Sequence, residues 1–466
     1  PAGVIEGPVV STAEAPSVPL APEGPQEGRR EDSGPSREEH RLGMQVATAH
    51  IPWARPLPGG PVKALVLMDD MNSREAVELA QRVDLDLDYV KFRTTLEKEY
   101  LWQGDLSIQT LEGAQKRLSE RLRQKPYDVL VLAGFRWDFH LTPELRDRIV
   151  ERVRAGMGLV LIQPDGFTRA EAERLPAAGV AAAGRAARDM NRWYAWAAAG
   201  SHPLTAGLDW TRFPATRRQE FEAAPVGTVL ATCGQDQAPL LIVGNAGQGR
   251  VITATWDTLT HDMSYRGYSA LTPILSYRGG WLRPEFAELP RGYHEWWFAL
   301  LARMVTSAAG RDLGVAVTAA DRVAGRLEDL PPVTVRLRCA DALEQARAEA
   351  YWQSAGGDMQ RTETAVPELP AGDGAVVLQP PAGALTAGDN TVCFVLRDRL
   401  GAARAWGFTT LALSAPNRLA ALKLTPSELL PAGGMWQADG AVETRAFTPA
   451  AVLRAEARIA PPALPG

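Results

Sequence analysis

Four short apolar runs alternate with amphipathic segments between residues 62 and 162, and this alternation limits the chain to a small group of folds. The runs are VKALVLMDD (62–70), DLDYVKF (86–92), YDVLVLAGF (127–135) and GLVLI (158–162). We interpret them as strands buried on both faces, because they lack the polar alternation of a strand with one face in solvent. Strands that alternate with helices in this way predict an α/β domain with a parallel sheet.

The segments between these runs carry the periodicity of helices. They are SREAVELAQRV (73–83), LEGAQKRLSERLRQ (111–124) and TPELRDRIVERVRAG (142–156). In the third segment, Thr142 is the expected N-cap and Pro143 occupies the first turn. Further strands are expected at 226–232, 239–245 and 249–257. A Gly-Gln-Gly turn joins the last two as a hairpin, and HEWWFALLARMVTSAAGR (294–311) closes the domain as an apolar-faced helix.

The pattern changes after residue 312 to shorter segments in which apolar and polar residues alternate. Turn residues separate these segments at intervals typical of a β-sandwich. The expected strands are VTVRLRC (333–339), ARAEAYWQ (346–353), GAVVLQP (374–380), NTVCFVLRD (390–398) and RAWGFTTLAL (404–413). Residues 416–466 resemble the opening strands of another sandwich. We interpret them as a partial second sandwich or as a strand-donating tail.

The first 60 residues differ from both regions, because they are rich in Pro, Gly, Glu and Ser, as in APEGPQEGRREDSGPSREEH. Such a composition buries too little apolar surface to offset the loss of chain entropy on folding. Within it, MQVATAHIPW (44–53) is a candidate short strand that fixes the arm. We therefore expect an arm or linker at 1–60, an α/β domain at 61–311, a sandwich at 312–415 and the partial sandwich or tail at 416–466.

The charge balance and the cysteine count exclude several classes of function. The net charge is -5 and the pI is about 5.8, which provides no basic footprint for a nucleic acid. Three cysteines make no disulfide framework and lack the spacing of a metal site. No apolar run is long enough to be a transmembrane segment. The chain begins at Pro1 without a charged-then-apolar leader, so we expect a processed or excised chain with any signal peptide outside it.

Several segments resemble the class I glutamine amidotransferase-like fold, which has a flavodoxin-like parallel sheet. They lie within residues 62–311 and include KALVLMDDMNSREAVELAQRVDLDLDYV, YDVLVLAGF, GLVLIQPDG, HPLTAGLDW, APLLIVGNAGQGRVITATWDT and YHEWWFALLARMV. The version most similar is the non-catalytic one of large bacterial surface proteins, and the trimerisation domains of some β-galactosidases are similar too. The sandwich resembles the immunoglobulin or fibronectin type III-like domains that often follow in such proteins.

The resemblance implies a site that has lost its catalytic residues. An active member has a strand that ends in Gly-Ile-Cys, and the matching strand here has Gln163 at the position of the nucleophile, followed by Pro164. An amide is no nucleophile, and proline removes a backbone N–H that an oxyanion hole could use. The catalytic His of the family falls at Trp256, with Asp257 beside it. We therefore expect no amidotransferase mechanism.

Carboxylates at strand ends are the remaining candidates for chemistry. They are Asp69, Asp70, Asp165 and Asp257. Ligands bind at this edge in open α/β sheets, so the four could hold a divalent cation or act as an acid–base pair. Aspartates at strand ends also cap the helix or turn that follows. We expect capping, with no metal and no cofactor.

Two cysteines of the sandwich imitate the Cys-Trp-Cys order of immunoglobulin domains, since Trp352 lies between Cys339 and Cys393. Strand parity argues against a disulfide. Cys339 shares the inner face with the valines and the leucine of its strand, whereas Cys393 lies opposite the apolar set that includes Phe394. A bridge between the sheets needs both Cβ atoms to point inward. Because Cys233 has no expected partner either, we expect three free thiols.

Together, these features indicate a non-catalytic structural or interaction protein that acts in oligomerisation or scaffolding. The alternative is a carbohydrate-active hydrolase, or a sugar-binding accessory module of a larger glycosidase, that uses the carboxyl edge of the sheet. The expected partners are further copies of the chain, other surface proteins or carbohydrate. The expected location is the extracellular space or the bacterial cell surface.

Overall fold

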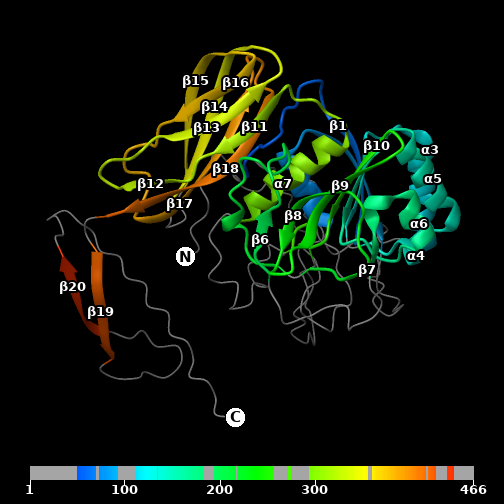
Figure 1. Cartoon of the computed structure of the whole chain (residues 1–466), viewed down its shortest axis with the longest axis horizontal. Helices are drawn as coiled ribbons and strands as arrows, with labels where there is room; N and C mark the ends of the chain where they lie inside the picture. The colour runs from blue at the N-terminus through cyan, green and yellow to red at the C-terminus, as the bar shows by residue number, and fades with distance from the viewer. Residues whose placement is uncertain are drawn as a thin grey trace, which may run out of the picture.

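The computed structural model contains an α/β domain, a β-sandwich that packs against it and a separate two-stranded hairpin (Figure 1). The structure describes residues 50–69, 73–92, 111–133, 135–181, 194–216, 218–256, 271–273, 293–354, 359–415, 418–426 and 438–445. Among these residues, no helix is both long and apolar enough to cross a membrane.

An eight-stranded sheet forms the centre of the α/β domain. Its strand order is β2-β1-β3-β4-β10-β9-β8-β6, in which the first five strands are parallel and the last three extend the sheet antiparallel. The strands are β1 (Val62–Asp69), β2 (Leu85–Phe92), β3 (Val129–Ala133), β4 (Gly158–Ile162), β6 (Trp196–Ala198), β8 (Thr228–Cys233), β9 (Ala238–Ala246) and β10 (Gly249–Ala254). The predicted parallel strands and the β9–β10 hairpin are confirmed.

Helices cover both faces of this sheet, because successive residues of a strand point to opposite sides. On β1, Leu65 packs in the cluster that holds α3 and α5, whereas Ala64 packs with α2 and α7. Thr142 caps α5 by accepting a hydrogen bond from the N–H of Leu145 at 3.4 Å, as predicted. The helices are α2 (Ser73–Arg82), α3 (Leu111–Gln124), α4 (Trp137–His140), α5 (Pro143–Arg154), α6 (Arg169–Arg174) and α7 (Tyr293–Ala308).

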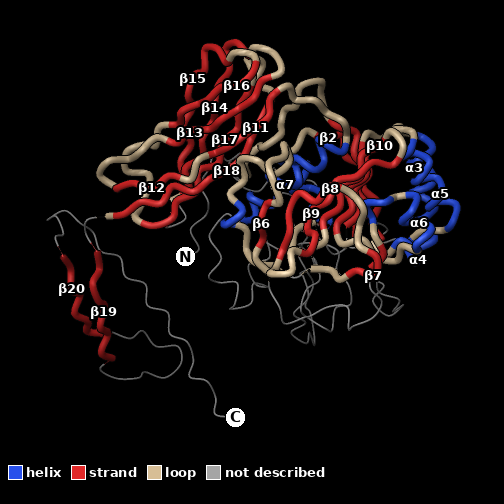
Figure 2. The backbone as a smooth tube through the Cα atoms, in the orientation of Figure 1, coloured by secondary structure: helices blue, strands red, loops and turns tan. Residues whose placement is uncertain are grey.

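The sandwich consists of a three-stranded sheet, β11-β13-β16, and a five-stranded sheet, β12-β18-β17-β14-β15 (Figure 2). The strands are β11 (Val315–Ala320), β12 (Val323–Arg326), β13 (Val333–Cys339), β14 (Leu343–Gln353), β15 (Met359–Leu369), β16 (Gly372–Leu378), β17 (Gly388–Arg397) and β18 (Ala403–Ser414). A core that includes Val335, Trp352 and Phe394 fills the space between the sheets. The sequence did not predict β15, because this edge strand carries few apolar residues and is mostly exposed.

The face of strand β17 that we expected to be exposed is covered by the α/β domain. The strand is therefore buried on both faces. Phe394 packs in the core of the sandwich together with Cys339, whereas Cys393 and Val395 pack in the core of the α/β domain. The opposite orientation of Cys339 and Cys393 is therefore confirmed, and all three cysteines of the chain are free. The face of Cys393 is apolar because it is an interface between domains.

The two domains share main-chain and side-chain contacts. Leu208 and Phe408 form a parallel β-bridge, and the N–H of Phe408 donates to the carbonyl of Gly207 at 3.0 Å. The indole N–H of Trp406 donates to the carbonyl of Ala299 in helix α7 at 3.0 Å. Strand β18 is thus attached both to a loop and to a helix of the α/β domain, which makes the two domains one block.

Ile51, Trp53, Ala54 and Leu57 pack in the core of the α/β domain, although we assigned them to the arm. Trp53 is fully buried, and its indole N–H donates to Glu295 Oε2 at 3.0 Å, across a sequence separation of 242 residues. Arg397 of the sandwich donates to the carbonyl of Pro52 at 3.0 Å. Because these partners are distant in sequence, composition alone did not locate the boundary between the arm and the α/β domain. Residues 1–49 of the predicted arm lie outside the described residues.

Near the C-terminus, β19 (Arg418–Pro426) pairs antiparallel with β20 (Ala438–Arg445). The rest of the segment 416–466 lies outside the described residues. The fold is thus an α/β domain with a mostly parallel sheet, followed by antiparallel β sheets. Whether the hairpin is part of a second sandwich or donates a strand stays a prediction.

Candidate functional site at the carboxyl end of strand β4

Strand β4 ends at Ile162, and the chain turns sharply at Gln163. The φ of Gln163 is 52°, in the left-handed region that residues other than glycine rarely occupy. Its N–H donates to the carbonyl of Ala254 at 2.8 Å, so the neighbouring strand β10 holds this backbone in place. Strained backbone at a strand end presents the nucleophile in many α/β enzymes. Here the residue is an amide that is only 3% exposed.

A second segment covers this turn from the side of β10. The side-chain amide of Gln219 donates to the carbonyl of Pro164, and the backbone N–H of Gln219 donates to the carbonyl of Thr255 at 2.8 Å. Both Pro164 and Gln219 are buried. The turn at Gln163 and Pro164 is therefore hydrogen-bonded to the neighbouring segment at Gln219, and this segment closes it to solvent.

Trp256 stands where the resemblance places a catalytic histidine, and it is fully buried. Its ring stacks on that of Trp196 with centroids 5.3 Å apart and meets Trp297 edge-on at 5.4 Å. Its indole nitrogen has no acceptor among the residues that the structure describes. Because an indole N–H is a donor without a basic lone pair, Trp256 cannot serve as a general base. It fills an aromatic core instead.

The predicted acidic edge is described at one of its members, Asp165. Asp165 Oδ1 accepts a hydrogen bond from the N–H of Gly166 at 2.7 Å, and the carbonyl of Asp165 accepts from the N–H of Trp137 at 2.8 Å. Only the first of these bonds involves the carboxylate, and the choice between capping and ligand binding at Asp165 stays a prediction. Within the described part of the chain, no three His, Cys, Asp or Glu side chains converge as a metal site. The side chains of the other three predicted residues lie outside the described part: Asp69, Asp70 and Asp257.

The cysteines and the buried histidine are not tuned for catalysis at neutral pH. Burial raises the pKa of the Cys233 thiol to about 11, and burial also raises the pKa of Cys339 and of Cys393. The reactive form of cysteine is the thiolate, so these thiols are poor nucleophiles. Burial lowers the pKa of His140 to about 4, and its Nδ1 accepts a hydrogen bond from the N–H of Arg136 at 3.0 Å. His140 is therefore a neutral packing residue.

Sequence reasoning missed Gln219 and its neighbour Arg218. Arg218 pairs with Asp236 at 2.6 Å and lies 4.4 Å from the ring centroid of Tyr194, which anchors the covering segment. Gln219 reaches Pro164 across a sequence separation of 55 residues. The residues around Gln219 form a polar run that is typical of a solvated surface. The sequence therefore carries no signal for its burial.

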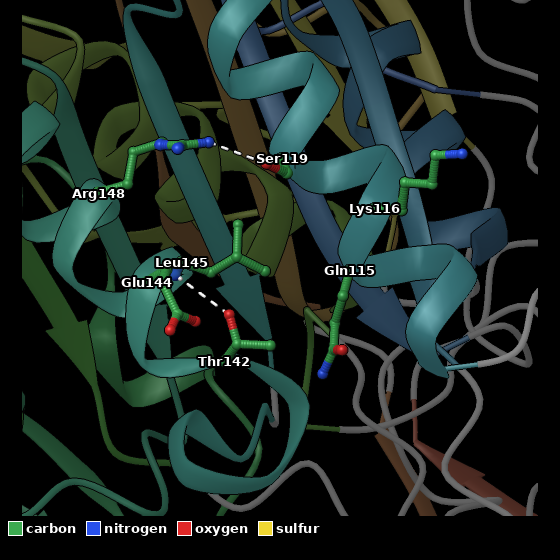
Figure 3. Close-up of a pocket in the computed structure, with 7 residues that line it drawn as sticks. All are labelled: Gln115, Lys116, Ser119, Thr142, Glu144, Leu145 and Arg148. Atoms are coloured by element: carbon green, nitrogen blue, oxygen red, sulfur yellow. Dashed lines mark hydrogen bonds between the residues drawn. The ribbon is translucent and has the colours of Figure 1, made fainter.

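Two hollows of the described surface lie away from Gln163. A pocket of about 200 Å³ lies between α3 and α5 (Figure 3). Its polar groups are already bonded, since Arg148 donates to Ser119 Oγ at 2.9 Å, and Figure 3 shows Lys116 extending away from the other labelled side chains. The second hollow is a cleft of about 890 Å³ between the α/β domain and the sandwich, which we call the interdomain cleft. It is lined by residues of β9, β10, α7, β11, β13 and β18, and by the loop at 202–204.

No family model and no curated protein matches this sequence. Among solved structures, two cytoplasmic proteins from Salmonella typhimurium are 16% and 15% identical over 53% of this chain and 99% of theirs, with TM-scores of 0.34 and 0.31. A β-galactosidase from Rahnella sp. R3 is 14% identical, with a TM-score of 0.28. That match covers 69% of this chain and 41% of the β-galactosidase, so the chain spans less than half the length of that enzyme. At these identities and TM-scores, the comparisons assign neither a family nor a function.

Proposed function

We propose that this chain is a non-catalytic structural module that acts in oligomerisation or scaffolding at the cell surface. In this proposal, an amidotransferase-like α/β domain without a nucleophile is joined to an immunoglobulin-like sandwich. The observation that carries it is the filling of the two catalytic positions. Gln163 is 3% exposed and Trp256 is 0% exposed, so both side chains are part of the packing. Neither presents a reactive atom to a substrate.

The sheet supports the amidotransferase-like part of the proposal. The parallel strands have the order β2-β1-β3-β4-β10, which corresponds to the flavodoxin-like order 2-1-3-4-5. The left-handed backbone of Gln163 supports it as well. Such a conformation costs about 1–3 kcal/mol in a residue other than glycine. A strained turn at a strand end is also the feature that presents the nucleophile in enzymes with a nucleophile elbow.

The junction between the domains supports the structural part of the proposal, because a scaffold must hold its domains in a fixed geometry. Arg397 of the sandwich pairs with Glu349 at 2.8 Å, and both side chains are 4% exposed. The same guanidinium donates to the carbonyls of Pro52 and Arg55, each at 3.0 Å. Both carbonyls belong to the segment that packs in the core of the α/β domain. This pair ties three parts of the chain together.

An activity assay tests the absence of catalysis. The purified chain is incubated with glutamine and with a set of nitrophenyl glycosides, and release of ammonia and of nitrophenol is measured. We expect no turnover beyond that of the variants Gln163→Ala and Asp165→Asn. Ammonia release that Gln163→Ala abolishes, or nitrophenol release that Asp165→Asn abolishes, would overturn the non-catalytic assignment in favour of the corresponding enzyme.

Sedimentation velocity over a wide range of protein concentrations tests the structural role. We expect the chain to self-associate, and a chain that stays monomeric at every concentration would contradict oligomerisation. Fractionation of cells that produce the full-length protein tests the surface location. Recovery of the protein in the cytoplasmic fraction alone would contradict that location.

A further inference from the structure

The interdomain cleft carries a charge arrangement that a purely structural role does not use. Its volume of about 890 Å³ lies within the range of roughly 300–1,000 Å³ that is typical of ligand pockets. Polar and apolar side chains of both domains contribute to its wall. Asp312 is an exposed carboxylate in the lining of the cleft. The other charged residues of the lining are arginines, namely Arg250, Arg303, Arg311, Arg338 and Arg404.

Most of these arginines are balanced by carboxylates of the protein. The pairs are Arg311 with Asp128 at 3.2 Å, Arg338 with Asp373 at 2.8 Å and Arg404 with Asp398 at 2.9 Å. Arg250 and Arg303 differ, because neither has a carboxylate within salt-bridge distance among the described residues. Asp312 Oδ1 accepts a hydrogen bond from the N–H of Gly314 at 2.9 Å, which turns that oxygen toward the domain linker.

Of the two arginines that have no carboxylate partner among the described residues, Arg303 is the buried one, with 6% of its surface exposed. Its Nη1 donates to the carbonyls of Pro203 at 3.2 Å and Ala206 at 2.6 Å, and its Nη2 donates to the carbonyl of Trp406. Carbonyl dipoles satisfy the N–H groups but supply no opposite charge. Burial accordingly lowers the pKa of Arg303 to about 9. A buried cation without a counter-charge is unfavourable unless an anion reaches it.

Arg250 lines the exposed side of the cleft. Its Nη1 donates to the carbonyl of Ser307 at 2.9 Å and to Ser307 Oγ at 2.8 Å. Ser307 is four residues after Arg303 in helix α7, which is roughly 6 Å along the helix axis. His202 also lines the cleft, and burial together with the charge of Arg250 lowers its pKa. His202 is thus neutral at pH 7 and adds a polar group without charge.

We propose that the interdomain cleft binds a carboxylate-bearing ligand, with the carboxylate held by the exposed Arg250 and attracted by the positive charge of the buried Arg303. The guanidinium fork matches the planar geometry of a carboxylate and forms charge-assisted hydrogen bonds with it. The carbonyl end of α7 at Ser307 carries the negative pole of the helix dipole, which disfavours a phosphate dianion more than a carboxylate with its single charge. This ligand site goes beyond the structural role and does not depend on it.

The remaining lining indicates the body of the ligand. Asn245 offers an exposed amide, whereas Val243 and Leu313 offer apolar surface. Such a wall suits a hydroxylated ligand such as an acidic sugar, and it also accepts the short chain of a small organic acid. Both sources share the carboxylate, so the experiment distinguishes them.

Titration calorimetry on the full chain at low salt tests the proposal with four probes: trigalacturonate, succinate, maltotriose and inorganic phosphate. We expect one or both carboxylate probes to bind and maltotriose not to bind. Binding of trigalacturonate alone identifies an acidic saccharide, and binding of succinate alone identifies a small acid. We expect Arg250→Gln to weaken binding about tenfold, the effect of losing about 1.4 kcal/mol of charge-assisted hydrogen bonding.

Matched variants separate recognition from folding. Arg303→Gln should also weaken binding, because it removes the buried positive charge, and its unfolding transition is recorded alongside. Because Arg250 is exposed, Arg250→Gln keeps the test decisive even if Arg303→Gln fails to fold. Arg336→Gln removes the same charge from an exposed residue of β13 that does not line the cleft, and it should leave affinity unchanged. The proposal is overturned if neither carboxylate probe binds, if maltotriose or phosphate binds as well as they do, or if Arg250→Gln binds like the parent chain.

Discussion

The buried side chain of Arg82 packs against helix α7, the buried side chain of Arg303 belongs to that helix, and the protein balances their charges in different ways. Arg82 is 1% exposed, pairs with Glu78 at 2.7 Å and bonds both carboxylate oxygens of Glu295. Arg303 is 6% exposed and bonds three carbonyl groups. Burial by itself lowers the pKa of both guanidinium groups, but the charges of Glu295 and Glu78 raise the pKa of Arg82 above its ordinary value. The pKa of Arg303 falls to about 9.

The difference teaches that burial alone does not reveal what a charged residue does. Around Arg82 the charge is compensated within the protein, and the same Glu295 also fixes Trp53, so this cluster stabilises the fold. Around Arg303, carbonyl dipoles are the only compensation among the residues that the structure describes, and the residue lines a cleft. An arginine of the first kind is a structural element, whereas one of the second kind can attract an anion from outside.

The largest expected effect concerns the compensated cluster. Arg82→Met leaves Glu78 and Glu295 buried without their cation, and breaking a buried ion pair in this way costs about 3–5 kcal/mol. Denaturant unfolding monitored by tryptophan fluorescence measures the loss. The control is Arg336→Met, which breaks a pair with Asp321 whose side chains are 55% and 37% exposed. That change should cost less than about 1 kcal/mol, and an equal loss in both variants would refute the distinction.

His140 shows a third way to bury a titratable group, namely in its neutral form. Burial lowers its folded pKa to about 4, below the unfolded value of 6.5. The unfolded chain therefore binds the proton first, and stability is lost as the pH falls from 6.5 toward 4. From pH 8 to pH 4.5 the parent chain should lose about 2–3 kcal/mol more stability than His140→Asn, which keeps an acceptor for the N–H of Arg136. Unfolding curves at both pH values decide it, and identical losses would contradict it.

The uncompensated arginine should be less costly to remove than Arg82. Arg303→Met leaves the carbonyls of Pro203, Ala206 and Trp406 without a donor, but it also removes a charge that no described carboxylate balances. Water in the cleft can reach these groups, so we expect a loss of about 1–2 kcal/mol. The same unfolding experiment measures it. A loss as large as that of Arg82→Met would mean that charge compensation does not separate the two sites.

Much of the fold was predictable from the sequence where burial follows from local pattern. Strands β1, β3 and β4 are nearly continuous apolar runs, whereas β2 at the sheet edge alternates with charged residues, and parity correctly separated Cys339 from Cys393. The local pattern of apolar and polar residues did not predict contacts between distant segments. Trp53 reaches Glu295 across 242 residues, and the outer face of β17 is buried only because another domain lies on it.

The candidate site was predictable to a lesser degree. The positions of Gln163 and Trp256 were identified through a resemblance, whereas their burial and the left-handed backbone of Gln163 required coordinates. The unbalanced charge of Arg303 was not predictable at all. Its environment depends on carbonyl groups of the loop at 203–206 and of strand β18, and backbone carbonyls carry no sequence signature.

The smallest expected effect extends the reasoning from buried charge to backbone strain at Gln163. With a φ of 52°, any residue with a Cβ atom is strained there, and glycine is not. Gln163→Gly and Gln163→Ala remove the same side-chain contacts, so the difference between them reports the backbone. Glycine usually destabilises an ordered position by about 0.5–1 kcal/mol relative to alanine. Here we expect the order to reverse, with Gln163→Gly more stable than Gln163→Ala by about 1 kcal/mol.

Gln219 is the control, because it is also buried but does not have a positive φ, and its glycine variant should be less stable than its alanine variant. If alanine is preferred at both positions, the turn at Gln163 stores no strain, and the support it gives to a former nucleophile elbow is lost.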